Sequence, residues 1–319
     1  MDNLSVSTVI LDGYAPFDAL ATLADIGVRQ VELAYIAGYT DFDERSLRPA
    51  EAARLRRRAE QLGISLPTLS AHFDLSGTGS LQKLERRIEF AATLGVGVLI
   101  SNVSQKQHLA RVRRTLENAI PALERARVVL AVENPGHGDN EIVGTAKELV
   151  EFVLSFNSPL LRANLDLCNI HTYSMGSGDG PVAALGMCRG VLASLHLKDV
   201  RTTQGGWAFC SIGEGEVTQS DLLAQLSRLD PRIPVCLELP LRLSRPNRGP
   251  PVRSALPVLL EHCRASVAAS IEAIARSSGL SRPATDDEER GYDASLTADK
   301  GADQRSRPGE RSQDHRSSD

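Results

Sequence analysis

Side chains that commonly bind metal ions end four successive apolar stretches of the sequence. Glu133 follows VVLAV and Asp166 follows LRANL, whereas His196 lies in VLASLHLKD and Glu238 in IPVCLEL. Three carboxylates brought into one place repel each other unless a cation lies among them. One imidazole and three carboxylates form a ligand set that suits Mn²⁺, Mg²⁺ or Co²⁺ and also accommodates Zn²⁺. The four residues therefore predict a site for one divalent metal ion.

Each of these residues also has a structural role available when it is taken alone. The two glutamates would be solvated charges at strand ends, Asp166 would cap the turn that follows it, and His196 would be a hydrogen-bonded core histidine. Their occurrence on four consecutive strand ends favours the metal site over four separate structural roles.

The elements that must position these residues alternate along the chain. Eight β-rich apolar stretches are separated by amphipathic segments, which is the pattern of βαβ units. No G-x-G-x-x-G follows the first stretch, which argues against the dinucleotide-binding fold. Glycines stand where three helices should end, at Gly27, Gly63 and Gly95. The expected strands are 6–11, 30–35, 64–73, 95–101, 128–134, 161–167, 191–199 and 233–239, with a last helix around 252–276.

This pattern predicts an α/β protein, a single (β/α)8 TIM barrel over residues 1–277, with the functional residues at the C-terminal ends of its strands. The composition then changes, because residues 278–319 are rich in Ser, Asp, Arg and Gly and nearly lack large aliphatic side chains. Such a segment buries too little apolar surface to order itself, so we predict a disordered polar tail over 278–319.

Composition and charge narrow the class of protein. The chain of 319 residues carries 36 basic and 40 acidic residues, and this near-balance argues against nucleic acid or an anionic membrane surface as partner. No apolar run approaches the roughly 18 residues that a membrane span needs. The five cysteines form no C-x-x-C pair, so buried free thiols and a cytoplasmic location are expected. The sequence leaves the oligomeric state open, and a homo-oligomer is compatible with it.

An ordered series of motifs resembles the xylose isomerase-like superfamily over about residues 5–275. The motifs are VEN (132–134), NLDLCN (164–169), SLHLKD (194–199), GEGEV (213–217) and LEL (237–239). The superfamily contains sugar isomerases, ketose 3-epimerases, cyclitol and shikimate-pathway dehydratases, and apurinic/apyrimidinic endonucleases. The resemblance implies that Glu133, Asp166, His196 and Glu238 bind the metal. It also implies that Glu133 and Glu238 are the catalytic acid and base.

The sequence departs from the superfamily's patterns at positions that contact the substrate. Asn169 stands where epimerase-like members have a histidine, with His171 two residues on. Thr202 stands where they usually have an arginine, with Arg201 beside it. The nuclease members need three zinc ions and further histidines, but Asn102 and Asn169 occupy two of those positions. A trinuclear nuclease site is therefore not expected.

The resulting expectation is a divalent-metal-dependent isomerase or epimerase that acts on a keto-sugar, keto-polyol or sugar phosphate through an enediolate. The alternatives are a dehydratase of keto-cyclitol or dehydroshikimate type at the same site, or a non-catalytic sugar-binding barrel. Glu32 is expected to hold a ligand histidine or a lysine in place. Lys198 would either neutralise an oxyanion or pair with Asp199 or Glu238. The expected substrate-binding residues are His72, Asn169, His171, Lys198, Arg201 and Trp207.

Overall fold

The computed structural model describes residues 3–41, 43–173, 180–217, 220–226 and 228–277. The expected polar tail, 278–319, lies outside the described residues. Within the described part, none of the helices combines the length and the apolar character that a membrane crossing requires.

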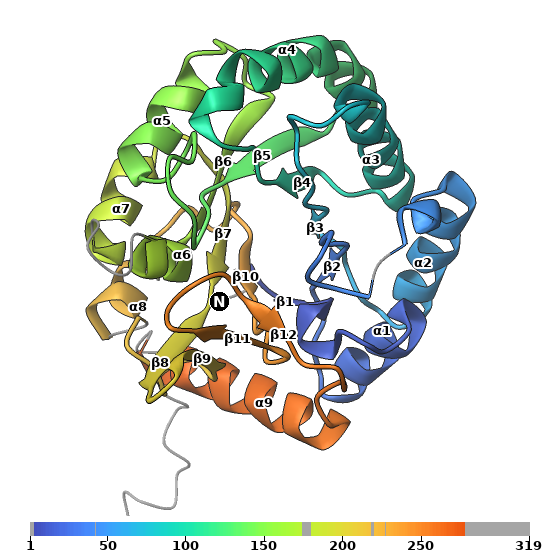
Figure 1. Ribbon diagram of the computed structural model, residues 1–319. Helices are drawn as coiled ribbons and strands as arrows, with labels where there is room; N and C mark the ends of the chain where they lie inside the picture. Colours follow the sequence, from blue (N-terminus) through green and yellow to red (C-terminus); the bar gives the residue numbers. More distant parts are fainter. Residues whose placement is uncertain (1–2, 42, 174–179, 218–219, 227, 278–319) are drawn as a thin grey trace, which may run out of the picture. The chain divides into compact units, whose positions relative to one another are not determined.

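Eight parallel strands close into a barrel, as predicted (Figure 1). The strands are β1 (Leu4–Ser7), β2 (Val31–Ala34), β3 (Thr68–Ser70), β4 (Val98–Ser101), β5 (Val129–Glu133), β6 (Leu161–Asp166), β7 (Leu192–Leu197) and β10 (Val235–Leu237). Strands β1 to β7 are neighbours in chain order, and β10 pairs with both β7 and β1 to complete the ring. The carboxyl ends of all eight strands consequently meet at one mouth of the barrel.

Helices surround the barrel and connect its strands (Figure 1). They are α1 (Pro16–Asp25), α2 (Pro49–Gln61), α3 (Ser80–Leu94), α4 (Leu109–Ala126), α5 (Ala146–Leu154), α6 (Leu167–Thr172), α7 (Pro181–Cys188), α8 (Ser220–Leu226) and α9 (Leu260–Ser277). Single 3-10 turns cover Thr8–Leu11, Glu44–Ser46 and Lys106–His108. Gly27, Gly63 and Gly95 have left-handed backbone conformations just after α1, α2 and α3, so the predicted helix stops are confirmed.

Several element boundaries differ from the expected ones. The expected strand 64–73 is reduced to β3 (Thr68–Ser70), and most other strands are shorter by one to three residues at an end. The stretch 6–11 was expected to be all strand, but β1 ends at Ser7, whose side-chain oxygen accepts a hydrogen bond from the Val9 amide and starts a 3-10 turn. The last helix was expected from about 252, but α9 begins at Leu260 because Val252 and Arg253 form a short strand.

A second, four-stranded antiparallel sheet was not predicted. It consists of β8 (Asp199–Thr203) and β9 (Gly206–Cys210), which follow β7, and β11 (Leu243–Pro246) and β12 (Val252–Arg253), which follow β10. Its order is β12-β11-β9-β8, so it joins the loops that leave two neighbouring barrel strands. This sheet matters for function because it supplies part of the wall of the pocket described below.

The apolar core contains one large cluster that spans the barrel and its helices, and all five cysteines are buried free thiols, as expected. The interior of the barrel also holds fully buried polar side chains. Glu32, Thr68, Asn164, Asp166 and His196 are all 0% exposed. Polar groups without access to water must bind each other or a ligand, so these residues mark where the site lies.

Candidate metal centre and substrate pocket

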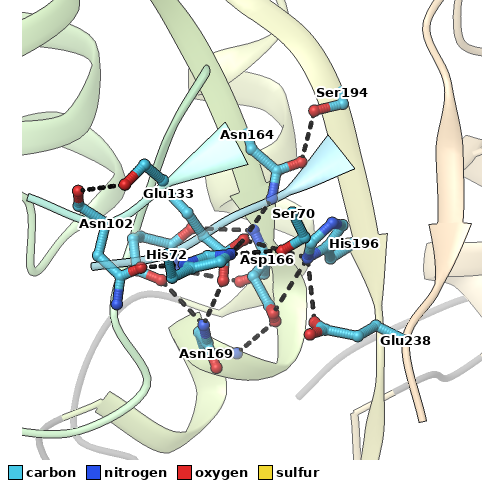
Figure 2. Close-up of polar contacts among 12 residues, drawn as sticks. Ser70, His72, Asn102, Glu133, Asn164, Asp166, Asn169, Ser194, His196 and Glu238 are labelled. Atoms are coloured by element: carbon cyan, nitrogen blue, oxygen red, sulfur yellow. Dashed lines mark hydrogen bonds and ion pairs between the residues drawn. The ribbon is translucent and has the colours of Figure 1, made fainter. Parts of the chain in front are cut away.

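The four predicted metal ligands come together at the carboxyl ends of β5, β6, β7 and β10 (Figure 2). Their ligand atoms all lie within 4.8 Å of one another. The Nδ1 atom of His196 is 3.1 Å from Oε2 of Glu133, 3.0 Å from Oε2 of Glu238 and 4.0 Å from Oδ2 of Asp166. Three oxygens and one nitrogen from four neighbouring strands therefore face a common point.

The polar atoms at this point fit a metal ion better than they fit each other. Oδ2 of Asp166, Nδ1 of His196 and Oε2 of Glu238 have charged neighbours but no hydrogen-bond partner among the described residues, although all three are buried. Burial without hydrogen bonds is unfavourable for such atoms unless a ligand satisfies them. A divalent cation of the Mn²⁺, Mg²⁺, Co²⁺ or Zn²⁺ class would do so, because it prefers this set of oxygen and nitrogen donors.

The second ring nitrogen of His196 interacts with the buried carboxylate of Glu32. Nε2 lies 3.1 Å from Oε2 of Glu32, and the Thr68 hydroxyl donates to the same carboxylate oxygen at 2.7 Å. A proton on Nε2 between His196 and Glu32 leaves a lone pair on Nδ1 for the metal. The structure thus places Glu32 against the ligand histidine, one of the two alternatives expected from the sequence.

The two carboxylate oxygens of Asp166 have different roles, because one caps a helix and the other faces the candidate metal centre. Oδ1 accepts a hydrogen bond of 2.8 Å from the Asn169 amide and caps the first turn of α6. Oδ2 faces the other ligands and lies 2.5 Å from Nζ of Lys198. The capping role and the ligand role considered for Asp166 are therefore compatible, because each uses a different oxygen.

Two asparagines fix the carboxylate of Glu133. The Asn164 amide donates to Oε2 at 2.7 Å, the Asn169 amide donates to Oε1 at 3.2 Å, and the Ser194 hydroxyl holds the Asn164 carbonyl at 2.7 Å (Figure 2). Sequence reasoning did not identify Asn164 or Ser194. The signal was available, because both are polar residues on the inward-facing side of otherwise apolar strands, where burial requires a partner.

Lys198 is a buried cation beside the ligands. Its Nζ lies 2.5 Å from Asp166 Oδ2 and 2.7 Å from Glu238 Oε2. Of its two expected partners, it thus pairs with Glu238. Asp199 instead accepts backbone hydrogen bonds from Val200 and from the GEGEV loop at Gly213, Gly215 and Val217. Lys198 also lines the pocket together with Glu238.

The pKa values of two carboxylates in this cluster are shifted in opposite directions. Burial, together with the neighbouring Glu133 and Glu238, raises the pKa of Asp166 to about 7 even though Lys198 opposes the shift. Burial also acts on Glu238, but Lys198 and His196 outweigh it and hold the pKa of Glu238 below its usual range. Carboxylates this close cannot all ionise freely without added positive charge, which a bound divalent cation supplies.

A pocket opens over the candidate metal centre. Glu133 and Glu238 line it together with three of the expected substrate-binding residues, namely His72, Asn169 and Lys198. Tyr39 and His137 from the barrel loops and Phe209, Leu243 and Arg245 from the small sheet form further walls. A cleft lined by Asp74, Ser104, His108 and Glu141 adjoins it and shares Tyr39, His72, Glu133 and His137. The pocket and the cleft together form a concave site of the kind that binds small molecules.

The other three expected substrate-binding residues do not line this pocket or its neighbouring cleft. Arg201 is exposed on β8, and Nε2 of His171 lies 3.6 Å from Oε2 of Glu216. Trp207 is buried beneath the arginines of the small sheet and packs in a cluster with Cys168, Val200 and Val217. Trp207 belongs to the antiparallel sheet that the sequence did not predict, where it pairs with Thr202 and Arg245.

A second group of potential ligands, formed by Glu32, His196 and Cys236, shares the imidazole with the first. Its nitrogen Nε2 is already engaged by Glu32, and burial raises the pKa of the Cys236 thiol well above its usual value. A protonated thiol is a poor metal ligand. The group therefore supports the first site and does not form a second one.

The sequence matches the model of the family described as xylose isomerase-like TIM barrel over residues 20–262. No curated protein sequence matches the chain. A solved structure of the protein IolI with a bound zinc atom is 17% identical and has a TM-score of 0.64, with 87% of this chain and 98% of that one covered.

Two further structures share the fold at similarly low identity. A 3-keto-D-glucoside 4-epimerase from E. coli is 12% identical with a TM-score of 0.59, over 83% of this chain and 97% of that one. A probable 3-DHS dehydratase from Bacillus anthracis is 16% identical with a TM-score of 0.58, over 74% of this chain and 92% of that one. The barrel, its order of strands and the match over most of the sequence agree: the chain belongs to the xylose isomerase-like TIM barrel family.

Proposed function

We propose that this protein is a divalent-metal-dependent isomerase or epimerase of a keto-sugar, keto-polyol or sugar phosphate. The observation that carries the proposal is the position of Glu133 and Glu238. Each contributes an oxygen close to Nδ1 of His196, and each lines the pocket above. Two carboxylates that face one substrate from different strands can remove a proton and return one. The E. coli structural relative is a 3-keto-D-glucoside 4-epimerase, which supports the same class.

The proposed metal ligands are Glu133, Asp166, His196 and Glu238. When bound there, a divalent cation would polarise the substrate carbonyl and lower the barrier to removing the proton on the adjacent carbon. Asp166 and His196 are the better purely structural ligands, because the capping hydrogen bond and Glu32 fix them from behind. The hydrogen bonds from Asn164 and Asn169 orient Glu133, and the ion pair with Lys198 orients Glu238.

The proton balance of the reaction needs only these two glutamates. One carboxylate takes the proton from the carbon between the carbonyl and the neighbouring hydroxyl, and the bonding electrons move toward the carbonyl oxygen. Return of a proton to the same carbon from the opposite face gives an epimer. Return to the neighbouring carbon, with transfer of the hydroxyl proton, gives the aldose–ketose isomer. The buried surroundings exclude the bulk water that would otherwise compete for these protons.

A dehydratase is the second candidate, and Lys198 is the observation that favours it. Its ammonium group lines the pocket next to Glu238. There it can protonate a leaving hydroxyl on the carbon next to the one that Glu238 deprotonates, and water is then expelled. The B. anthracis structural relative is a probable 3-DHS dehydratase, which is consistent with this chemistry.

A substrate screen in heavy water separates these candidates from a non-catalytic sugar-binding barrel. The metal-loaded protein is incubated with ketoses, ketose phosphates, keto-inositols and dehydroshikimate. An isomerase or epimerase places deuterium on the carbon next to the carbonyl, which mass spectrometry detects. A dehydratase yields a conjugated product with new ultraviolet absorbance. A sugar that raises the Tm while no compound is converted would overturn the enzyme proposal in favour of a binding role.

A further inference from the structure

Arg245 differs from the other buried arginines in what surrounds its charge. Three arginines among the described residues are buried, namely Arg87, Arg242 and Arg245, with exposed fractions of 0%, 6% and 3%. Arg87 forms an ion pair of 2.6 Å with Glu44, and Arg242 forms ion pairs with two aspartates, the shorter at 2.8 Å. Within the described ranges, no carboxylate pairs with Arg245. A buried charge without a counter-charge is costly, so Arg245 is an exception among them.

Backbone carbonyls use only part of the hydrogen-bonding capacity of Arg245. Its Nε donates to Gly249 at 2.8 Å, Nη1 to Gly136 at 2.5 Å and Nη2 to Arg248 at 3.1 Å. The guanidinium also lies over the ring of Trp207, 5.2 Å from its centroid. A guanidinium has five N–H donors, so the three bonds use only about three of them, and among the described residues no carboxylate balances the positive charge.

The charge of Arg245 acts on the pocket, which Arg245 lines together with Lys198, His137 and Tyr39. Burial lowers the pKa of His137 to about 4, and Arg245 and Lys198 act in the same direction. His137 is therefore neutral near pH 7, and its Nε2 lies 3.2 Å from the Tyr39 hydroxyl. Above the carboxylates of the metal site, this wall of the pocket thus combines a cation with neutral hydrogen-bonding groups.

We propose that Arg245 binds an oxyanion of the substrate, a carboxylate or a phosphate ester, and so selects an acidic keto compound over a neutral sugar. A planar guanidinium matches the two oxygens of such a group, and a desolvated site strengthens the interaction. The pair Tyr39 and His137 supplies further hydrogen bonds. This inference deepens the proposed function, on which it relies for the reacting end of the substrate, whereas the anion site itself depends only on Arg245 and its neighbours.

The competing role for Arg245 is that of a purely structural clamp. Its bond to Gly136 ties the loop after β5 to strand β11. The two roles differ in what they need from the side chain. A clamp needs three donors in a fixed geometry, whereas an anion site needs the positive charge. Arg245→Lys keeps the charge and loses the clamp, and Arg245→Gln loses the charge.

The chain also provides a matched control in Arg248. Its guanidinium lies over the same Trp207 ring, 4.9 Å from the centroid, but the residue is exposed and does not line the pocket. Arg248→Gln therefore removes a neighbouring cation from the same aromatic ring without touching the proposed anion site.

The first test titrates inorganic phosphate into the full chain by calorimetry at fixed ionic strength, before and after removal of metal. Wild type should bind phosphate at one saturable site with an affinity in about the millimolar range, as expected for so small a ligand. Binding should persist in the metal-free protein, which separates the anion site from the metal site. Arg245→Gln should weaken binding at least about tenfold, Arg245→Lys should weaken it less, and Arg248→Gln should change it less than about twofold.

The second test identifies the source of the oxyanion with D-fructose, D-fructose 6-phosphate and 5-keto-D-gluconate, which are a neutral, a phosphorylated and a carboxylated six-carbon keto compound. The metal-loaded wild type should prefer one of the two acids at least about tenfold over D-fructose, and Arg245→Gln should abolish the preference while retaining metal content. The proposal is overturned if wild type binds no phosphate, if Arg245→Gln binds it as well as wild type, or if the neutral sugar binds equally well. Loss of metal binding with intact phosphate binding would instead refute only the proposed function.

Discussion

Nε2 of His196 and Oε2 of Glu32 lie 3.1 Å apart in the centre of the barrel, and both side chains are fully buried. The pair joins β7 to β2 across the barrel interior, because these strands are not neighbours in the sheet. Glu32 is therefore the residue that decides which nitrogen of His196 carries the proton, and with it whether Nδ1 is free to bind a metal.

Glu32→Gln should weaken metal binding by about ten- to a hundredfold, because an amide holds the Nε2 proton less strongly than a carboxylate. Competition with a chelating dye measures the dissociation constant. Thr68→Val is the matched control, since it removes the hydroxyl that donates to Glu32 and leaves the carboxylate in place. We expect it to change metal affinity by less than about threefold, because only a neutral hydrogen bond is lost. Unchanged affinity in Glu32→Gln would contradict the role given to Glu32.

Removing a ligand that has no proposed role in proton transfer should empty the metal site. The purified protein is expected to hold about one divalent ion per chain, and chelation should lower its Tm, because an ion that binds only the native state stabilises it. Elemental analysis of His196→Ala and Asp166→Asn should find little metal. Asp166→Asn keeps an oxygen that can cap α6, so its fold should be retained. Full metal occupancy in His196→Ala would refute the ligand assignment.

The fold could be predicted from local signals because each strand and helix carries its own pattern. Glycines with left-handed backbone conformations ended three helices where expected, and eight apolar stretches became eight barrel strands. The small sheet escaped prediction for a physical reason. Its strands have two to five residues, and β11 pairs with β9 across a long separation in sequence, for example Arg245 with Trp207. Pairing at such distance leaves no periodic signal within either segment.

Part of the candidate site could also be predicted from the sequence. The four candidate ligands stand out in the sequence because acidic and imidazole groups seldom end apolar strands unless a partner or a cation compensates their burial. The structure brings the four side chains together, and metal binding by them stays a prediction. Their supporting residues Asn164 and Ser194 resemble any polar residue in a strand until burial shows that they need partners. Arg245 carried no signal either, because the segment LRLSRPNRG is typical of a solvated basic loop. Only the fold shows that Arg242 and Arg245 of this segment are buried and that Arg245 lines the pocket.

His137 should make the stability of the metal-free protein depend on pH in the acidic range. Its native pKa of about 4 lies below the value of about 6.5 in an unfolded chain. Between these values the unfolded state binds a proton that the native state excludes, so the free energy of unfolding falls as the pH drops from about 6.5 toward 4. Above a pH of about 6.5 the imidazole is neutral in both states and contributes nothing.

His137→Asn should therefore lose less stability than wild type between about pH 7 and pH 5, by about 1–2 kcal/mol. Urea unfolding at the two pH values, with chelator present, measures the difference. An identical loss in both proteins would show that His137 titrates normally. A nuclear magnetic resonance titration of its ring gives the pKa directly and should show a rise in Arg245→Gln, because a neighbouring positive charge is removed.

Glutamine at the two proposed catalytic glutamates should separate metal binding from proton transfer. An amide retains an oxygen for the metal but cannot accept the substrate proton. Glu133→Gln and Glu238→Gln should each keep substantial metal while turnover of the substrate found in the screen falls at least about a hundredfold. Glu141→Gln is the control, because Glu141 lines the neighbouring cleft and is not among the ligands. It should retain activity within about threefold, since no proton-transfer group is lost.

The two variants should also differ from each other in stability. Oε1 and Oε2 of Glu133 each accept a hydrogen bond from an asparagine amide. In Glu133→Gln, the new side-chain NH2 group must therefore face another N–H donor. This should lower the free energy of unfolding by about 1–3 kcal/mol. Exchange of the substrate's carbon-bound proton in heavy water then shows which glutamate removes the proton and which returns it. If one variant still exchanges the substrate's carbon-bound proton without forming product, its glutamate returns the proton and the other removes it. Full turnover in either variant would exclude that glutamate from proton transfer. Loss of metal in both variants would show that the two glutamates bind the metal, and would leave their role in proton transfer without support.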